Sequence, residues 1–357
     1  MKAAAAFLAL LLLLSACAQP AEEVKSEEPP VSETTEQASL APIEDLHEIY
    51  FAGGCFWGVE AFFERLPGVT DAVSGYANGE GEPSYRNIMR TETGYAETVR
   101  VSYNRNAISL PALVSAYLRI VDPFSLNRQG NDAGTQYRTG IYSENPKDLE
   151  TARAILAQAQ TAHDRPFVIE TEPLAVFYEA EDEHQDYLTN NPAGYCHIDL
   201  GLAEENLYPG EWDTPEDAEL KEMLSPLQYE VTREKGTERA FDNEYYDETA
   251  KGIYVDITSG QPLFRSDDKF VSQSGWPSFT RAITPDAILL ETDSSLGMRR
   301  VEVLAKESGS HLGHVFPDGP GDEGGLRFCM NSAALRFIPV EDMEEAGYGV
   351  LIPWLEQ

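Results

Sequence analysis

The sequence predicts two folded domains, the first a mixed α/β domain (an α+β two-layer sandwich) and the second a mainly β domain. A chain of 357 residues is long enough for two domains of about 150 residues each. Strand-like and helix-like segments alternate over 46–200, which is typical of a mixed domain. Over 222–357 the apolar residues follow the patterns of strands and hairpins. We therefore expect two domains joined by a linker at 201–221.

The chain is strongly acidic, with 61 Asp and Glu residues against 26 Lys and Arg residues and a formal net charge of −35. Binding to nucleic acid or to anionic lipid headgroups depends on neutralising phosphate with Lys and Arg. The composition therefore argues against nucleic acid as a partner.

The N-terminus has the pattern of an export signal. Lys2 precedes twelve apolar residues, Ala3 to Leu14, which are too few to span a bilayer and match the apolar region of a signal peptide. The run ends in Leu14-Ser15-Ala16-Cys17, which resembles the lipobox of bacterial lipoproteins. We therefore expect a lipoprotein signal peptide at 1–17 and an exported protein, held on a membrane by lipid on Cys17 and facing the periplasm or the cell exterior. An ordinary secretory signal, cleaved near Ala18, is the alternative.

Residues 18–45 separate this signal from the first domain. They carry eight acidic residues among Pro, Ser and Thr, without apolar periodicity. Such a segment cannot bury enough apolar surface to offset the entropy lost on ordering. We expect a disordered acidic tether.

The first domain is expected to open with a strand followed by a helix. His47 to Phe51 is a strand-like run that breaks at Gly53-Gly54. Apolar residues then recur at helical spacing from Val59 to Leu66, and Pro67-Gly68 ends the helix. Cys55 thus lies at a strand-to-helix turn, where the helix dipole and free N–H groups favour a thiolate.

The rest of the first domain continues the alternation. Residues 97–103 have the period of a half-buried strand, which puts Glu97 on a face with apolar residues. Helices are expected at 108–121, 147–162 and 183–188, and one or two strands over 167–177.

The domain boundary is indicated by the segment 204–222, which has eight acidic residues in nineteen and no regular apolar face. Beyond it, residues 252–257 alternate, Ser259-Gly260 turns the chain and residues 262–264 follow. This pattern predicts a hairpin.

The chain has four cysteines, Cys17, Cys55, Cys196 and Cys329. No pair has C-x-x-C spacing, so neither a tetrathiolate zinc site nor a thioredoxin-type redox motif can be built. Lipidation of Cys17 would leave three, of which one must lack a partner. A structural disulfide between Cys55 and Cys196 is one reading, since exported proteins commonly form disulfides, and a reactive Cys55 is the other.

Motifs over residues 47–200 resemble those of peptide methionine sulfoxide reductase A. They are Gly53-x-Cys55-Phe56-Trp57-Gly58, Gly94-Tyr95-Ala96-Glu97, the segment Asn127 to Arg138, and Glu183-His184-Gln185-x-Tyr187-Leu188. The resemblance implies that the Cys55 thiolate attacks a sulfoxide sulfur and becomes a sulfenic acid. It also implies that Cys196 then condenses with this sulfenic acid to a disulfide.

The same resemblance implies roles for the neighbours of Cys55. Glu97, whose alternative is a surface carboxylate, protonates the departing oxygen, because a bare oxide is a poor leaving group. The resemblance implies that Phe56 and Trp57 contact the substrate methyl group; the alternative is that both are core residues. It also implies Tyr85 and Tyr137 as contacts of the sulfoxide oxygen and Asp132 as a polar anchor.

In the second domain Arg327, Cys329 and Asn331 alternate with apolar residues, so a strand would place the guanidinium, thiol and amide on one face. A cation beside a thiol lowers its pKa. His311 and His314 lie upstream and could act as acids. A metal-binding H-x-x-H pair, for which no third ligand is evident, and ordinary hydrogen-bonded histidines are the alternatives.

Motifs over residues 222–354 resemble methionine sulfoxide reductase B. They are Gly252-Ile253-Tyr254, Ser274 to Phe279, His311 to Pro320, and Leu326 to Ser332. The resemblance implies Cys329 as nucleophile, His311 and His314 as groups that bind and protonate the oxygen, Asn331 and Arg327 as groups that tune the thiolate, and Trp276 as the methyl pocket.

The second domain departs from this family's pattern in two ways. The paired C-x-x-C zinc motifs of many members are absent, so no metal is expected. The position where many members hold a recycling cysteine is Ser274, which leaves Cys329 without a resolving thiol in its own domain.

Together the resemblances imply a bifunctional enzyme, similar to known A–B fusions, that repairs oxidised proteins. A sulfoxide sulfur is chiral, so one shaped pocket presents only one epimer to its thiolate. The resemblances imply that the first domain takes the S epimer of methionine sulfoxide and the second the R epimer. We expect no bound cofactor, an external thiol reductant such as a thioredoxin-like envelope protein, and oxidised envelope proteins as substrates. The rival classes are a solute-binding or adhesion lipoprotein with inert cysteines and a general thiol-disulfide oxidoreductase.

Overall fold

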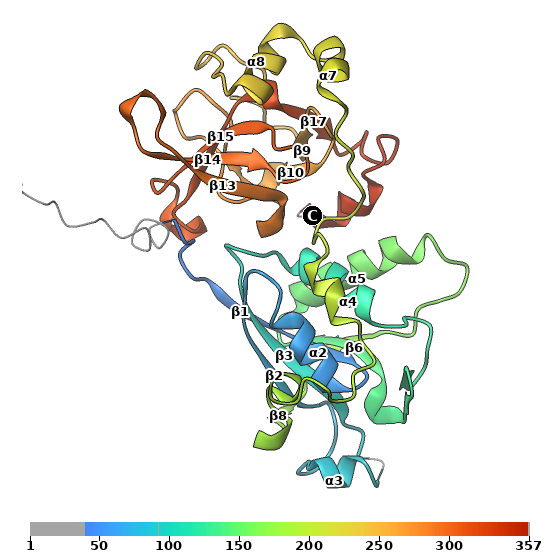
Figure 1. Cartoon of the computed structure of the whole chain (residues 1–357). Coiled ribbons are helices and arrows are strands. Elements are labelled where there is room, and N and C mark those ends of the chain that lie inside the picture. Colours follow the sequence, from blue (N-terminus) through green and yellow to red (C-terminus); the bar gives the residue numbers. More distant parts are fainter. Residues whose placement is uncertain (1–39, 92, 356–357) are drawn as a thin grey trace, which may run out of the picture. The chain divides into compact units, whose positions relative to one another are not determined.

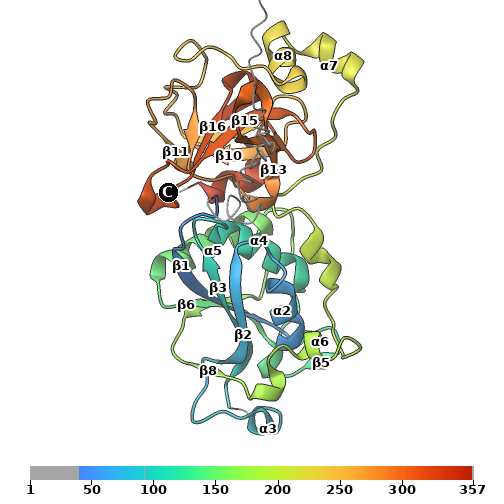
Figure 2. The ribbon, with the colours of Figure 1, turned by 60° about the vertical axis from the view of Figure 1, so that its left-hand side comes forward.

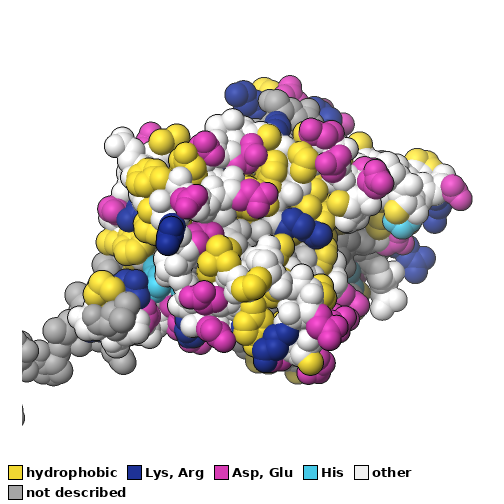
Figure 3. All heavy atoms as spheres, turned by 90° about the horizontal axis from the view of Figure 1, so that it is seen from above, with side chains coloured by type: hydrophobic (Ala, Val, Ile, Leu, Met, Phe, Trp, Pro, Cys, Tyr) yellow, Lys and Arg dark blue, Asp and Glu magenta, His cyan; other side chains and the backbone are white. Residues whose placement is uncertain are grey.

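The computed structural model describes residues 40–91 and 93–355 (Figure 1). The predicted signal peptide, Cys17 and most of the predicted tether lie outside these residues. Within the described ranges no helix is long and apolar enough to cross a membrane. Acidic side chains are spread over the face shown in Figure 3 and lie among its basic ones, as expected for this composition.

A six-stranded sheet forms the centre of the first domain, in the order β7-β6-β1-β3-β2-β8 (Figures 1 and 2). Its strands are β1 (Leu46–Gly53), β2 (Val69–Ala77), β3 (Ala96–Asn104), β6 (Thr139–Ser143), β7 (Glu170–Pro173) and β8 (Phe177–Glu179). β6 and β7 pair in parallel, and the other neighbours are antiparallel. The predicted strands at 47–51 and 97–103 and the mixed α/β class are confirmed.

Two helices fix the end of β1, from which the chain turns to Cys55. The Phe51 ring on β1 stacks on Phe63 of α2 (Phe56–Phe63), with 4.6 Å between ring centroids, and on Tyr117 of α4 (Leu110–Ile120), with 5.0 Å. Both helices therefore cover the same face of β1. α4 begins where the Ser109 side chain accepts a hydrogen bond from the Ala112 N–H.

The remaining elements of the first domain are short, apart from α5. They are α3 (Tyr85–Ile88), β4 (Arg128–Gln129), β5 (Asp132–Ala133), α5 (Pro146–Gln160), α6 (Tyr187–Asn190) and the 3₁₀ turns Thr135–Tyr137, Asp182–His184 and Leu200–Glu204. The helices predicted at 108–121 and 147–162 are confirmed as α4 and α5, and the predicted strands at 167–177 are β7 and the start of β8.

The helix predicted at 183–188 is wrong. The chain forms a 3₁₀ turn and then α6, with the left-handed Asp186 (φ 51°) between them. The side chain of Gln185 accepts a hydrogen bond from Ser74 N–H and donates one to Ser74 O, both at 3.0 Å. These bonds tie the segment to β2 and interrupt the helix. The first predicted helix is also shorter than expected, because α2 ends at Phe63 although Leu66 is still buried.

The second domain is built from two antiparallel sheets. The first has the order β10-β9-β17, with β9 (Gly252–Asp256), β10 (Pro262–Arg265) and β17 (Leu335–Pro339). The second has the order β11-β12-β16-β15-β14-β13, with β11 (Lys269–Phe270), β12 (Ser278–Phe279), β13 (Ile288–Asp293), β14 (Arg300–Ala305), β15 (His311–Phe316) and β16 (Arg327–Met330). The predicted hairpin and the mainly β class are confirmed.

The segment between the two sets of sheets contains α7 (Asp217–Met223) and α8 (Pro226–Glu234). α8 starts with a reciprocal capping box, in which Ser225 and Gln228 bond each other's main-chain N–H. Leu207 and Tyr208, inside the predicted linker, are buried. The exact domain boundaries stay predictions.

Two candidate active sites

Cys55 is the N-cap residue of α2 and is buried, with 7% of its surface exposed. Burial raises the pKa of its thiol well above the usual range, the Glu97 charge raises it further, and the main-chain N–H of Trp57 lowers it. The helix start therefore lowers the pKa of the Cys55 thiol, as the sequence predicts, but burial raises this pKa by more. Burial therefore favours the thiol form of Cys55.

Glu97 lies on β3 beside this thiol and is 1% exposed. Its Oε2 accepts a hydrogen bond from Phe56 N–H at 3.1 Å, which joins the strand to the first turn of α2. Burial raises the pKa of Glu97 to about 8, against the lowering effect of this hydrogen bond, and the Asp132 charge adds to the rise. Glu97 therefore carries a proton at neutral pH, as a general acid must. Its burial rules out the alternative of a surface carboxylate.

Aromatic rings gather around the start of α2. Phe56 is buried, and its ring centroid lies 6.3 Å from that of Trp57 and 6.5 Å from that of Tyr85. His184 and Tyr187 belong to one of the sequence motifs, but no role was predicted for them. Trp57 Nε1 donates to His184 Nδ1 at 3.3 Å, and the Trp57 ring stacks on Tyr187 at 3.7 Å. These contacts hold the indole in place.

Tyr137 and Asp132 reach the same region from the loop after α4. Burial raises the pKa of Tyr137, and the charges of Glu97 and Asp132 add to the rise. Tyr137 Oη donates a hydrogen bond to Met89 Sδ at 3.5 Å. This hydroxyl can therefore face a methionine side chain. Asp132 Oδ2 is buried without a hydrogen-bond partner.

Cys196 lies against the first turn of α2. A Cβ atom at Gly58 would be 3.0 Å from Cys196 Sγ, and this sulfur donates to Ile198 O at 3.2 Å. The neighbouring His197 Nε2 is 3.1 Å from Gly53 O. Among the described residues Cys55, Cys196 and Cys329 are all free thiols, so the structural disulfide is not formed here.

Substitution Gly58→Ala is expected to slow formation of the Cys55–Cys196 disulfide. The added methyl group would press on both Cys196 Sγ and Ile198 Cδ1, at 3.0 and 3.1 Å. Misplacing a reacting group by a fraction of an ångström to 1 Å costs about 10- to 100-fold in rate. Quenched-flow thiol counting would show the first thiol lost at the normal rate and the loss of the second thiol, which reports the disulfide, delayed. An unchanged rate of disulfide formation would contradict this contact.

Cys329 on β16 faces side chains from both neighbouring strands. It pairs with His314 of β15 and with Ser278 of β12, and directly opposite residues of antiparallel strands share a face. Burial raises the pKa of the Cys329 thiol, while hydrogen bonds from Ser274 and Ser278 and the Arg327 charge lower it. Ser274 Oγ lies 3.7 Å from Cys329 Sγ.

A β-bulge brings the two predicted histidines together. Val303 pairs with Gly313 but Leu304 pairs with His311, so Leu312 is an extra residue in β15. In a regular strand His311 and His314 would point to opposite faces, whereas here their ring centroids are 5.4 Å apart. Gly313 allows the close approach of Cys329 O, which leaves no room for a side chain.

Each histidine is held by a carboxylate that sequence reasoning missed. His311 Nδ1 lies 2.7 Å from Glu302 Oε1, and His314 Nε2 lies 2.8 Å from Asp293 Oδ2. Burial lowers the pKa of both imidazoles, and their carboxylates raise it in part. In the sequence Glu302 alternates with apolar residues, as a solvent-facing residue of a strand does. The sequence therefore did not indicate that Glu302 belongs to the site.

The other predicted residues of this site are braced by the main chain or by one carboxylate. Arg327 forms two hydrogen bonds to Asp318, both 2.9 Å. The Asn331 amide donates to Leu312 O at 3.0 Å and accepts from Glu238 N–H at 3.2 Å, so these contacts anchor the strand end rather than the thiol. Trp276 Nε1 donates to Glu238 O at 3.2 Å.

Neither site matches a metal centre. Over 40–91 and 93–355, no three His, Cys, Asp or Glu side chains are grouped to hold a metal ion. The expectation that the chain needs no metal or cofactor stays a prediction.

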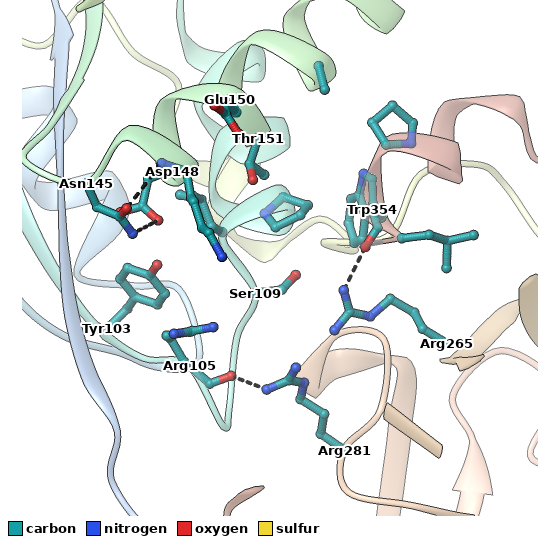
Figure 4. A pocket seen from close by; sticks show the side chains of 16 residues that line it. Tyr103, Arg105, Ser109, Asn145, Asp148, Glu150, Thr151, Arg265, Arg281 and Trp354 are labelled. Carbon is teal, nitrogen blue, oxygen red and sulfur yellow. Dashed lines mark hydrogen bonds between the residues drawn. The ribbon is translucent and has the colours of Figure 1, made fainter. Parts of the chain in front are cut away.

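The cavity of about 420 Å³ drawn in Figure 4 contains none of the predicted site residues. Its Arg265 bonds Asp268 and Trp354 O, and its Arg281 bonds Arg105 O. We therefore do not assign it to either site.

In each domain a free thiol lies near a group that can hold a proton, Cys55 near Glu97 and Cys329 opposite His314, and this arrangement fits a thiol-dependent oxidoreductase with two sites. The family model for peptide methionine sulfoxide reductase matches residues 47–215, and the SelR domain model matches residues 224–339. The chain therefore belongs to the methionine sulfoxide reductases, as a fusion of an A-type domain with a B-type domain. Its two domains reduce the S and the R epimer of methionine sulfoxide.

Solved structures similar to this chain include reduced Mxr1 from Saccharomyces cerevisiae, with 36% identity over 43% of this chain and 92% of that chain and a TM-score of 0.41. Methionine sulfoxide reductase A of Corynebacterium diphtheriae has 36% identity over 42% of this chain and 77% of its own, with a TM-score of 0.40. Mxr1 in complex with Trx2 has 28% identity over 40% of this chain and 84% of its own, with a TM-score of 0.30.

Proposed function

We propose that Cys55 reduces the S epimer with Glu97 as its acid, and that Cys329 reduces the R epimer with the His311–His314 pair. The observation that carries the proposal is the buried Glu97, protonated at neutral pH and bonded to the residue that follows Cys55. Phe56, Trp57, Tyr85, Tyr137 and Asp132 bind the first substrate, and Trp276, Arg327 and Asn331 serve the second.

The chemistry at the first site balances without a cofactor. Glu97 gives its proton to the sulfoxide oxygen and recovers one from the Cys55 thiol, whose sulfur attacks the sulfoxide sulfur. In total R₂S=O and Cys–SH become R₂S and Cys–SOH, so that the cysteine sulfur loses the two electrons that the sulfoxide gains. Cys196 then attacks the sulfenic acid, forming the disulfide and releasing water.

Recycling differs between the domains, because Ser274 cannot form a disulfide with Cys329. Cys196 is partly exposed, so a thioredoxin-like protein can reduce the disulfide that it forms with Cys55. The oxidised Cys329 must instead be reduced by a small external thiol or by another route. Oxidised proteins that contain methionine sulfoxide are the substrates, and free methionine sulfoxide is a further one.

Trapping experiments on the full chain test this proposal. One equivalent of R-sulfoxide under anaerobic conditions is expected to leave a dimedone adduct on Cys329, and one equivalent of S-sulfoxide a Cys55–Cys196 disulfide. Peptide mapping reads both outcomes. A Cys196–Cys329 linkage after R-epimer turnover would contradict direct external reduction, and an unmodified Cys329 would contradict the sulfenic acid step.

We also propose that the enzyme is exported and held on a membrane by lipid on Cys17, where it repairs envelope proteins. A multiply acylated cysteine buries enough CH₂ groups for stable attachment, which a single acyl chain does not. Cys17→Ala should therefore release the protein from washed membranes without changing turnover in solution. Retention of the variant in salt-stripped membranes would contradict the lipid anchor.

A further inference from the structure

Met89 is a methionine of this chain that lies against the first active site. Its sulfur accepts a hydrogen bond from Tyr137 Oη at 3.5 Å, and Gln136 Nε2 lies 3.8 Å from the same sulfur. Met89 is 41% exposed, so an oxidant in solution can reach it. The chain therefore holds an oxidisable thioether of its own beside a hydroxyl of the proposed oxygen site.

The position of Met89 follows from the short helix α3, which lies in the connection between β2 and β3 (Figure 1). The Met89 N–H bonds Tyr85 O at 3.1 Å, and residues four positions apart in a helical turn lie on one face. The Tyr85 ring lies 6.5 Å from Phe56 and 4.3 Å from His184, between ring centroids. Met89 therefore lies on the side of α3 that faces the site.

The Tyr137 hydroxyl cannot serve Met89 and a substrate at once, because it has one hydrogen to donate. Over residues 40–91 and 93–355 this hydroxyl donates to one acceptor, Met89 Sδ. A sulfoxide oxygen that binds Tyr137 must displace this sulfur. A thioether sulfur is a weak acceptor and the oxygen of a sulfoxide is a polar, stronger one, so the substrate wins the exchange.

Oxidation of Met89 reverses this balance. A peroxide can supply the oxygen atom: its O–O bond breaks, an S–O bond forms, the Met89 sulfur loses two electrons, and the reduced peroxide leaves as water or an alcohol. The Met89 sulfoxide then presents a strong acceptor close to both Tyr137 and Gln136. Because it is tethered at the site, it has a high effective concentration and competes better than a free sulfoxide.

We propose that Met89 is an oxidation site that controls access to the first active site: its thioether yields Tyr137 to the substrate, whereas its sulfoxide retains Tyr137 and excludes the substrate. This role depends on the proposed contact between Tyr137 and the substrate oxygen. Oxidation should therefore weaken binding of the S epimer and leave the chemistry at Cys55 intact.

Met89→Leu and Met89→Gln in the full chain test this role. Leucine keeps the apolar bulk but accepts no hydrogen bond, so KM for the S epimer should fall by about two- to fivefold, the effect of one weak hydrogen bond. Glutamine offers an amide oxygen as a stronger acceptor, so KM should rise by about fivefold or more. The kcat for the S epimer should stay unchanged in both variants, because Cys55 and Glu97 are left in place.

Peroxide treatment tests the oxidised state directly. The protein is oxidised while Cys55 and Cys196 form a disulfide, which protects both thiols, and peptide mapping confirms an added oxygen on Met89. After removal of the peroxide, initial rates with dithiothreitol should show KM for the S epimer raised by about fivefold or more in the unmodified chain and not raised in Met89→Leu. Met298→Leu is the matched control, because Met298 is 45% exposed and lies in the second domain. Its KM should rise as in the unmodified chain.

Opposite KM shifts distinguish this role of Met89 from a structural one, which would change KM in the same direction in both variants or lower kcat. Unchanged KM values, or shifts in one direction, would overturn the proposal. A rise of KM in oxidised Met89→Leu equal to that of the oxidised unmodified chain would also overturn it.

Tyr137→Phe separates this role from the function on which it depends. S-epimer turnover should fall in Tyr137→Phe, and Met89→Leu and Met89→Gln should no longer differ in KM when combined with it. Unchanged turnover in Tyr137→Phe would refute the oxygen contact itself. Reduced turnover in Tyr137→Phe, together with equal KM values in the two Met89 single variants, would refute only the role of Met89.

Discussion

Replacing Cys55 by serine is expected to lower S-epimer turnover to the uncatalysed background and to leave R-epimer turnover unchanged, and Cys329→Ser is expected to do the reverse. A hydroxyl cannot form the sulfenic acid that we propose for each site, so each loss should be on the order of 10³-fold or more. The two thiols lie in separate parts of the fold, Cys55 beside α2 and β3 and Cys329 on β16 beside β15. Anaerobic turnover of each pure epimer with dithiothreitol measures both activities.

Cys196→Ser is the matched control for the first site. It removes a thiol that lies against Gly58 but leaves Cys55 and Glu97 in place. A first methionine should therefore form at the normal rate, while repeated turnover with a thioredoxin stops. Loss of both epimer activities in any folded single variant would contradict two independent sites.

Local sequence patterns were sufficient to place Cys55 at the turn between β1 and α2. Gly53-Gly54 and the apolar spacing that follows act over a few residues, so the pattern alone carries the geometry. The alternation that put Glu97 on an inward face was equally reliable, because it depends on one strand. The sequence did not indicate how strongly burial raises the pKa of Cys55, since that burial is set by tertiary packing.

Features that depend on contacts distant in the sequence could not be predicted. The break at Asp186 follows from hydrogen bonds between Gln185 and Ser74, residues separated by 111 positions. The bulge at Leu312, which turns His311 toward His314, arises from the register against β14. The family resemblance named both histidines but did not supply Glu302.

In the mechanism that we propose, the two domains use different groups to protonate the departing oxygen. Burial raises the pKa of Glu97 and so favours its neutral acid form, while burial lowers the pKa of His311 and His314 and so favours their neutral imidazole form. Burial therefore favours the protonated form of the acid in the first site and disfavours the protonated form of the histidines in the second. The pH dependence of the two activities should differ for this reason.

Glu97→Gln is expected to lower S-epimer turnover by about 10²- to 10⁴-fold, the usual contribution of a general acid. The amide oxygen of glutamine can still accept the Phe56 N–H bond, so the turn at Cys55 should keep its geometry. The pKa of Glu97 is raised to about 8, and the protonated form is the active acid. S-epimer turnover in the unmodified protein should therefore be constant at neutral pH and fall as pH rises through about 8.

Glu60→Gln provides the control for this last prediction. Glu60 is also buried, lies on α2, accepts a hydrogen bond from Ser74 N–H at 3.0 Å and has a pKa raised to about 7 by burial. Because its partner is β2 rather than the turn at Cys55, the decline near pH 8 should persist in Glu60→Gln. That decline should be absent from the residual activity of Glu97→Gln and from R-epimer turnover in the same samples. If Glu97→Gln retained a full S-epimer rate with the same decline, the proton would have to come from another group, and Tyr137 would be the next to test.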